Sequence, residues 1–105
     1  MNQEMSERLQ KISERLKRDY NAEKVILFGS YARGEETEDS DVDILVISPT
    51  KERMIERMTS VSRIIRNLRN GLPISPIVLT PEEFSQKIDK GDAFIKTITE
   101  EGLVL

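Results

Sequence analysis

The sequence contains no histidine and no cysteine, and only 5% of its 105 residues are aromatic. Without histidine and cysteine, nucleophilic catalysis by Ser-His or Cys-His pairs is excluded, and so is a zinc site built from imidazole or thiolate ligands. The absence of cysteine also excludes disulfide bonds, which agrees with a reducing compartment. Any catalysis must therefore use carboxylates, hydroxyls, lysine, arginine or an oxygen-bound metal ion such as Mg²⁺ or Mn²⁺.

Long hydrophobic runs are also missing from the sequence. No apolar stretch approaches membrane-spanning length, and the N-terminal residues MNQEMSERLQ contain no hydrophobic segment of the signal-peptide type. We therefore expect a cytoplasmic protein without membrane contact. The formal net charge of −3 argues against a nucleic-acid-binding surface, because such surfaces are normally basic. The length predicts one domain, residues 1–105, with a single modest core.

The most informative stretch is VILFGSYARGEETEDSDVDILVI, which runs from Val25 to Ile47. Its two apolar runs are bounded by turn residues and predict buried strands at Lys24–Phe28 and Asp41–Ser48. The first strand is continuously apolar, so we expect it to be covered on both faces. Both faces of the second strand become apolar beyond Asp43, which indicates a central strand whose first residues emerge at a cleft.

Gly29 and Ser30 directly follow the first predicted strand. Glycine allows the backbone to approach a phosphate closely, and we predict that Ser30 caps a short helical turn that ends at Arg33 and Gly34. The N–H groups of this turn and the Ser30 hydroxyl would face a triphosphate. The alternative is a capped turn that binds no ligand, and the aspartates downstream weigh against it.

Asp41 and Asp43 lie two residues apart on the second predicted strand, so both side chains point to the same face. Two carboxylates separated by about 7 Å along the backbone suit a divalent metal ion with oxygen ligands. The acidic loop Glu35–Ser40 would repel a nucleotide unless cations intervene, which agrees with a metal-dependent site. The alternative is a structural pair that Arg33 or a lysine neutralises.

The remaining elements follow from apolar periodicity and capping residues. We predict these segments: an amphipathic helix over Glu4–Tyr20, a long helix over Lys51–Asn70 with Gly71 as its C′ residue, a strand over Pro73–Thr80, a helix from Pro81 to about Lys90 capped by Thr80, a helix over Ala93–Glu100 with Phe94, Ile95 and Ile98 turned inward, and a short strand at Leu103–Leu105. The long helix carries five arginines, which we interpret as a solvated face rather than as a nucleic-acid contact: Arg53, Arg57, Arg63, Arg66 and Arg69.

The turn and the aspartate pair together resemble a known signature. Gly29-Ser30-Tyr31-Ala32-Arg33-Gly34, followed by Ser40-Asp41-Val42-Asp43, is similar to the GSxxRG…SDxD motif of minimal nucleotidyltransferases in the polymerase-β-like superfamily. The resemblance implies an α/β (α+β) nucleotidyltransferase fold with a short mixed sheet packed by helices. It further implies that Gly29, Ser30 and Arg33 bind the nucleotide, with ATP as the expected substrate, and that Asp41 and Asp43 are catalytic and hold Mg²⁺ or Mn²⁺.

One position departs from this family pattern. The resembling family has a third aspartate on the next strand, about five residues before the threonine that ends it, and counting back from Thr80 leads to Ser75. Serine cannot replace the carboxylate in two-metal catalysis. The neighbouring Pro76 removes a ladder donor, which suits an edge strand. Carboxylates of the acidic loop are alternative substitutes: Glu35, Glu36, Glu38 and Asp39.

Two functions follow as hypotheses. A chain of this size and signature resembles the antitoxin half of MNT/HEPN toxin–antitoxin pairs, and this resemblance implies transfer of AMP from ATP to a hydroxyl of a HEPN-type partner protein. The absence of an acceptor-binding domain implies a partner or a homo-oligomer. The alternative is a non-catalytic nucleotide- or partner-binding module that has lost the third carboxylate, and Ser75 favours it. A nucleic-acid-modifying enzyme is disfavoured by the acidic charge and the shortage of stacking aromatics.

Overall fold

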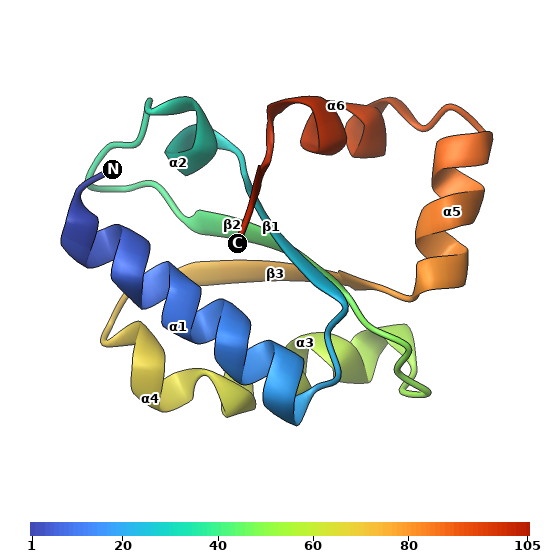
Figure 1. Ribbon diagram of the computed structural model, residues 1–105, viewed down its shortest axis with the longest axis horizontal. Coiled ribbons are helices and arrows are strands. Elements are labelled where there is room, and N and C mark those ends of the chain that lie inside the picture. Colours follow the sequence, from blue (N-terminus) through green and yellow to red (C-terminus); the bar gives the residue numbers. More distant parts are fainter.

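The computed structural model describes all residues 1–105 and contains one four-stranded sheet with helices on both faces (Figure 1). In chain order, the elements are α1 (Gln3–Asp19), β1 (Lys24–Phe28), α2 (Ser30–Arg33), β2 (Val42–Ile47), α3 (Met54–Ile64), α4 (Arg66–Arg69), β3 (Ile74–Leu79), α5 (Pro81–Asp89), α6 (Ala93–Glu101) and β4 (Leu103–Val104). No helix is both long enough and apolar enough to cross a membrane.

The sheet has the strand order β3-β2-β1-β4. β1 pairs antiparallel with β2 and with β4, whereas β2 pairs parallel with β3. The predicted short mixed sheet packed by helices is therefore confirmed, and β2 is a central strand as expected. Because α3 and α4 lie between β2 and β3 in the chain, they supply the crossover that a parallel pair requires.

Side chains of β1 alternate between two hydrophobic clusters. Val25 and Leu27 belong to the larger cluster, which joins one face of the sheet to α1 and α3. Ile26 and Phe28 belong to the smaller cluster, which joins the opposite face to α6. All four side chains are buried, so the expectation that this strand is covered on both faces is confirmed.

The predicted long helix is interrupted at Ile65. The helix begins at Met54 rather than at Lys51, and α3 ends at Ile64 before the short α4 begins. At the break, the carbonyl oxygen of Ile64 accepts a hydrogen bond from the Arg15 guanidinium of α1 (3.4 Å). The Leu68 N–H bonds to the Ile65 carbonyl (2.9 Å) instead. The apolar period continues through the break because Ile65 is fully buried, which explains why periodicity alone did not reveal it.

Two side-chain placements also differ from the sequence expectations. Phe94 was expected to point inward, but its side chain is 53% exposed and packs edge-on against the ring of Phe28. Ile95 and Ile98 are buried as predicted. Arg57 is not part of a solvated basic face, because it is buried and donates hydrogen bonds to Glu83 (2.6 and 3.3 Å). A helical wheel cannot anticipate this pairing, since Glu83 comes from α5, 26 residues further along the chain.

The outer edge of β3 carries Pro76, as expected for an edge strand. The carbonyls of Pro73 and Leu79 accept hydrogen bonds from the β2 side, at the N–H groups of Val42 and Ser48. Since strand residues alternate in direction, the intervening Pro76 and Val78 direct their main-chain groups outward. Proline has no N–H to offer there, and the Val78 carbonyl accepts a hydrogen bond from Arg57 (3.3 Å).

Candidate nucleotide-binding site

The two aspartates of the signature lie where β2 begins. Asp43 is the second residue of the strand and is half-buried, whereas Asp41 precedes the strand and is exposed. In the sheet, Asp43 lies between Phe28 of β1 and Ser75 of β3, its register partners on either side. The position opposite Asp43 on the neighbouring strand, which the resembling family fills with a third carboxylate, therefore holds a hydroxyl in this chain.

Gly29 connects β1 to α2 in direct contact with Asp43. Its φ of +74° lies in the region that favours glycine, and a Cβ at this position would overlap the Oδ2 atom of Asp43. The Gly29 carbonyl accepts hydrogen bonds from the N–H groups of Ala32 (3.1 Å) and Arg33 (3.2 Å). The close turn expected from the sequence is thus present, and it places the backbone of Gly29 against the aspartate carboxylate.

The capping role predicted for Ser30 is not seen. Gly29 is the N-cap residue, Ser30 is the first residue of α2, and no side chain caps this turn. Gly34 ends the turn in the left-handed conformation, as predicted. Because the main chain of Gly29 already closes the turn, the hydroxyl of Ser30 is not used for capping.

The electrostatic environment of the aspartates is only weakly compensated. Burial and the neighbouring Asp41 carboxylate raise the pKa of Asp43, and the Arg33 guanidinium partly offsets this increase. Neither aspartate forms an ion pair. Arg33, the cation expected to neutralise them, instead contacts the carboxylates of Glu35 (3.5 Å) and Glu101 (3.9 Å). The alternative of a structural pair neutralised by Arg33 or a lysine therefore has no direct ion pair to support it.

The donor atoms of Asp41 and Asp43 fit a hard divalent cation, since carboxylate oxygens are the ligands that Mg²⁺ prefers. The two side chains have no cationic partner within ion-pair distance, so a metal ion would supply the missing positive charge. No group of three or more acidic side chains forms a ready-made metal cluster. The acidic loop does not complete such a cluster, and its Glu36 instead lies 3.9 Å from the terminal amino group.

A hollow of about 370 Å³ adjoins Asp41 on the β3 side. It is lined by Asp41 and Ser75 together with Met58 and Ser62 of α3 and Arg69 of α4. The sequence alone does not connect α3 and α4 with this site. The only pattern that pointed to them was the excess of arginines on the segment, which did not indicate which arginine lines the hollow with Asp41.

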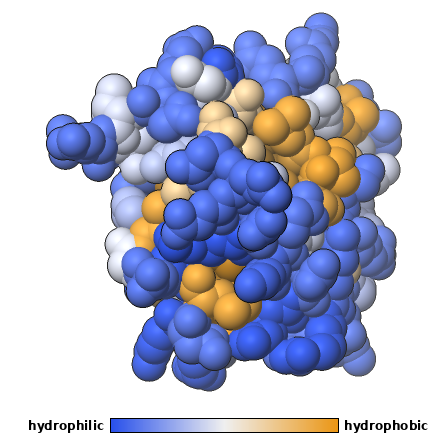
Figure 2. All heavy atoms as spheres, turned by 60° about the vertical axis from the view of Figure 1, so that its left-hand side comes forward, coloured by the Kyte–Doolittle hydropathy of each residue, from blue (hydrophilic) through white to orange (hydrophobic).

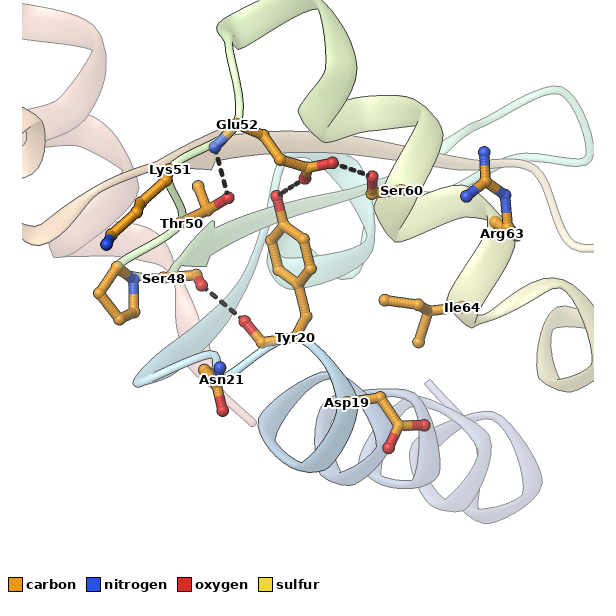
Figure 3. Close-up of a pocket in the computed structure, with 11 residues that line it drawn as sticks. Asp19, Tyr20, Asn21, Ser48, Thr50, Lys51, Glu52, Ser60, Arg63 and Ile64 are labelled. Atoms are coloured by element: carbon orange, nitrogen blue, oxygen red, sulfur yellow. Dashed lines mark hydrogen bonds between the residues drawn. The ribbon is translucent and has the colours of Figure 1, made fainter.

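A larger hollow of about 460 Å³ lies at the opposite end of β2, beside Ser48 (Figure 3). At its centre Glu52 accepts hydrogen bonds from the Tyr20 hydroxyl (2.7 Å) and the Ser60 hydroxyl (2.5 Å). These bonds tie the end of α1 to the segment before α3. Since the polar groups of this network satisfy one another, we interpret it as a structural connection rather than as a ligand site.

The molecular face near the signature is largely hydrophilic. In Figure 1 the loop from α2 to β2 and the start of β3 lie on the left-hand side, which comes forward in Figure 2. Figure 2 shows hydrophilic residues over most of this face, with hydrophobic residues confined to separate patches. A highly charged ligand such as a nucleotide is compatible with that surface.

The sequence and the fold of this chain are similar to those of known proteins. A Methanocaldococcus jannaschii protein named "Putative protein adenylyltransferase" is 41% identical over 83 residues, covering 78% of this chain and 76% of that protein. Another protein of that organism, with the same name, is 40% identical over 90 residues, covering 83% of this chain and 60% of the relative. This chain thus spans less than two thirds of the second relative.

A crystal structure of a "putative nucleotidyltransferase" from Sulfolobus solfataricus superimposes with a TM-score of 0.59 and 27% sequence identity, covering 93% of this chain and 76% of that one. Residues 9–105 match the family described as nucleotidyltransferase domain, so the match includes the turn, the aspartate pair and all four strands. The chain belongs to the nucleotidyltransferase domain family.

Proposed function

We propose that this protein transfers AMP from ATP to a hydroxyl of a partner protein in the cytoplasm, as the antitoxin of an MNT/HEPN pair. The observation that carries the proposal is the contact between Gly29 and the Asp43 carboxylate, beside Asp41, with no protein cation paired to either aspartate. The names of the M. jannaschii relatives support adenylyl transfer to protein, and the HEPN-type partner rests on the resemblance of the sequence signature.

In this proposal, the Gly29 backbone and the Ser30 hydroxyl bind the triphosphate, and Arg33 orients or neutralises a phosphate. Asp41 and Asp43 would hold Mg²⁺ or Mn²⁺, which when bound supplies positive charge for the triphosphate and polarises the reacting oxygens. The acceptor oxygen forms a bond to the α-phosphorus of ATP, the bond from that phosphorus to the bridging oxygen breaks so that pyrophosphate leaves, and the proton of the acceptor hydroxyl passes to solvent water.

The first experiment measures transfer of labelled AMP from ATP to the product of the neighbouring gene. We expect transfer by the wild-type protein and its loss in Asp43→Ala. Asp39→Ala is the matched control, because Asp39 is an exposed aspartate of the adjoining loop. Transfer by Asp43→Ala at the wild-type rate would contradict the assignment of the site.

A second function, a nucleotide- or partner-binding module without catalysis, is favoured by Ser75 opposite Asp43. Calorimetric titration of ATP with Mg²⁺ separates binding from transfer. Equal heats from the wild type and an Asp41→Ala, Asp43→Ala double variant would reject the metal-site assignment. Binding of ATP and of the neighbouring gene product by the wild type, without any transfer, would favour the module.

A further inference from the structure

The first half of α3 presents large apolar side chains to solvent. Ile55 is 80% exposed, Met54 is 55% exposed and Met58 is 51% exposed. We call these three residues the α3 strip. None belongs to either hydrophobic cluster, so the fold gains little from their apolar character. Contiguous exposed apolar side chains on an otherwise charged protein indicate a surface that another molecule covers.

The α3 strip is continuous with the candidate site. Met58 lines the hollow that contains Asp41 and Ser75, and Met54 lines a second hollow, beside Leu79 and α5. α3 packs beside β3, the strand that bears Ser75 (Figure 1). A molecule that covers the strip therefore extends to the β3 side of Asp41, whereas the Gly29 turn approaches Asp43 from the β1 side.

The charge next to the strip indicates the chemistry of that molecule. Arg69 lines the same hollow as Met58, and its guanidinium forms no ion pair or hydrogen bond within the chain. By contrast, the α3 arginine Arg57 and the adjoining Arg53 are paired to Glu83 and Glu56. An acidic side chain beside an apolar surface would complement Arg69.

We propose that the α3 strip is the docking surface for the protein that accepts the nucleotidyl group, and that Arg69 pairs with an acidic residue beside the acceptor hydroxyl. This inference rests on the proposed function. The partner presents an apolar segment to Met54, Ile55 and Met58 and places its hydroxyl in the hollow lined by Ser75. Arg69 acts as a specificity-determining residue, and the nucleotide binds without it.

The test uses the product of the neighbouring gene as the probe and compares Ile55→Glu with Val104→Glu. Both residues are exposed and apolar, 80% and 65% respectively, but Val104 lies on β4 at the other edge of the sheet. We expect Ile55→Glu to lower kcat/KM for the acceptor protein at least tenfold and to leave the heat of ATP binding unchanged. Val104→Glu should stay within twofold of the wild type. Circular dichroism checks that each variant is folded.

The charge is tested with Arg69→Glu, with Arg69→Lys as the conservative variant and Arg66→Glu as the neighbouring exposed arginine. We expect Arg69→Glu to raise the KM for the acceptor protein at least fivefold with ATP binding unchanged. Arg69→Lys should restore most of the lost efficiency, and Arg66→Glu should have little effect. An unchanged KM in Arg69→Glu would overturn the role of Arg69.

Other outcomes are decisive as well. Transfer that is insensitive to Ile55→Glu, or lost in Val104→Glu instead, overturns the docking surface while leaving the proposed function intact. A dimer that Ile55→Glu dissociates in sedimentation experiments overturns it too, because the strip then faces a second copy. If the wild type transfers no AMP, the proposed function fails, and docking is judged by calorimetry: binding of the probe protein that Ile55→Glu abolishes supports it, and binding that is equal or absent overturns it.

Discussion

Asp43 is a carboxylate held in a setting that does not favour its charge. Burial and the neighbouring Asp41 raise its pKa, and no side chain donates a hydrogen bond to it. Such an arrangement costs folding free energy, and proteins retain it mainly where a bound ligand supplies the missing charge. This loss of folding free energy is confined to Asp43, because the next two residues on the same face of β2, Leu45 and Ile47, are buried among apolar neighbours.

Asp43→Asn should therefore stabilise the protein while removing its function. Replacing the carboxylate with an isosteric amide removes the repulsion from Asp41, and we expect a gain of roughly 0.5–2 kcal/mol in the free energy of unfolding. The measurement is urea denaturation at pH 7 in the presence of EDTA, alongside the transfer assay. Asp39→Asn in the exposed loop is the control and should change neither quantity. A destabilised Asp43→Asn protein would show that the charge contributes favourably to the fold.

Gly29 and Gly34 offer a matched pair at the same turn. Both have positive φ, +74° and +72°, but a Cβ at Gly29 meets Asp43 whereas a Cβ at Gly34 meets nothing within 4 Å. Backbone strain should make alanine cost about 1 kcal/mol at Gly34, which is left-handed, and about 1–3 kcal/mol at Gly29, whose φ of +74° and ψ of −155° are adopted almost only by glycine. Only Gly29→Ala should displace the aspartate and weaken ATP binding in the presence of Mg²⁺, as measured by calorimetry. Equal ATP affinities of the two variants would contradict the importance of this contact.

At the scale of elements, Arg57 joins α3 to its neighbours. Its guanidinium donates to Glu83 at the start of α5, to the Val78 carbonyl of β3 and to the Glu52 carbonyl before α3. Glu83 in turn completes the capping box with Thr80. One buried side chain thus fixes the positions of a helix, a strand and a helix start, and with them the orientation of the α3 strip.

Arg57→Met should destabilise the protein by about 2–3 kcal/mol, because it removes the cationic partner of Glu83 and the side-chain donor to two carbonyl groups. Arg53→Met is the control, since Arg53 is 83% exposed and its pair with Glu56 is worth less than about 1 kcal/mol. Urea denaturation measures both. An effect of Arg57→Met no larger than that of Arg53→Met would show that the buried contacts contribute little.

The same pair predicts a pH dependence. Arg57 holds the pKa of Glu83 below its ordinary value of 4.5, so the pair stabilises the native state at pH values above 4.5. This contribution disappears as the pH falls through the lowered pKa in the folded state, where Glu83 becomes protonated. The difference in stability between wild type and Arg57→Met should therefore be largest near pH 7 and smaller below pH 4. A difference that grows on acidification would contradict this account.

The sequence was sufficient to predict elements that are specified by neighbouring residues alone. The β1 segment has the predicted bounds, and Thr80 with Pro81 marks the start of α5, because apolar runs and capping residues specify them within a few positions. It failed at Ile65 and Arg57, where the partners, Arg15 and Glu83, come from distant elements. Tertiary contacts of this kind leave no periodic trace in the sequence.

For the whole molecule, the strand order determines what the site can contain. Pairing of β2 with β1 on one side and β3 on the other brings Gly29 and Ser75 to either side of Asp43. The sequence indicated the first of these neighbours through the short spacing of the signature. The second required the β2–β3 register. The Arg69 side of the hollow required the position of the α3–α4 crossover beside Asp41, which the helix predicted over Lys51–Asn70 did not specify.

Ligand binding should be visible as a change in global stability. A ligand that binds only the native state stabilises it by about 2.7 kcal/mol at a concentration 100 times its Kd. Under the proposed function, ATP with Mg²⁺ should raise the Tm of the wild type, and excess EDTA should abolish the increase. The Asp41→Ala, Asp43→Ala double variant should show no Mg²⁺-dependent increase. An increase of equal size in the double variant would place the metal requirement elsewhere.

The outer edge of β3 has a consequence for how recognition can evolve in this protein. Pro76 lacks an N–H and Arg57 occupies the Val78 carbonyl, so the row of main-chain groups that another strand would need in order to join the sheet is interrupted at these two positions. Recognition along this side must therefore depend on side chains of α3 and α4. Side-chain contacts can be altered one codon at a time, so a change of partner along this edge would not require the sheet itself to change.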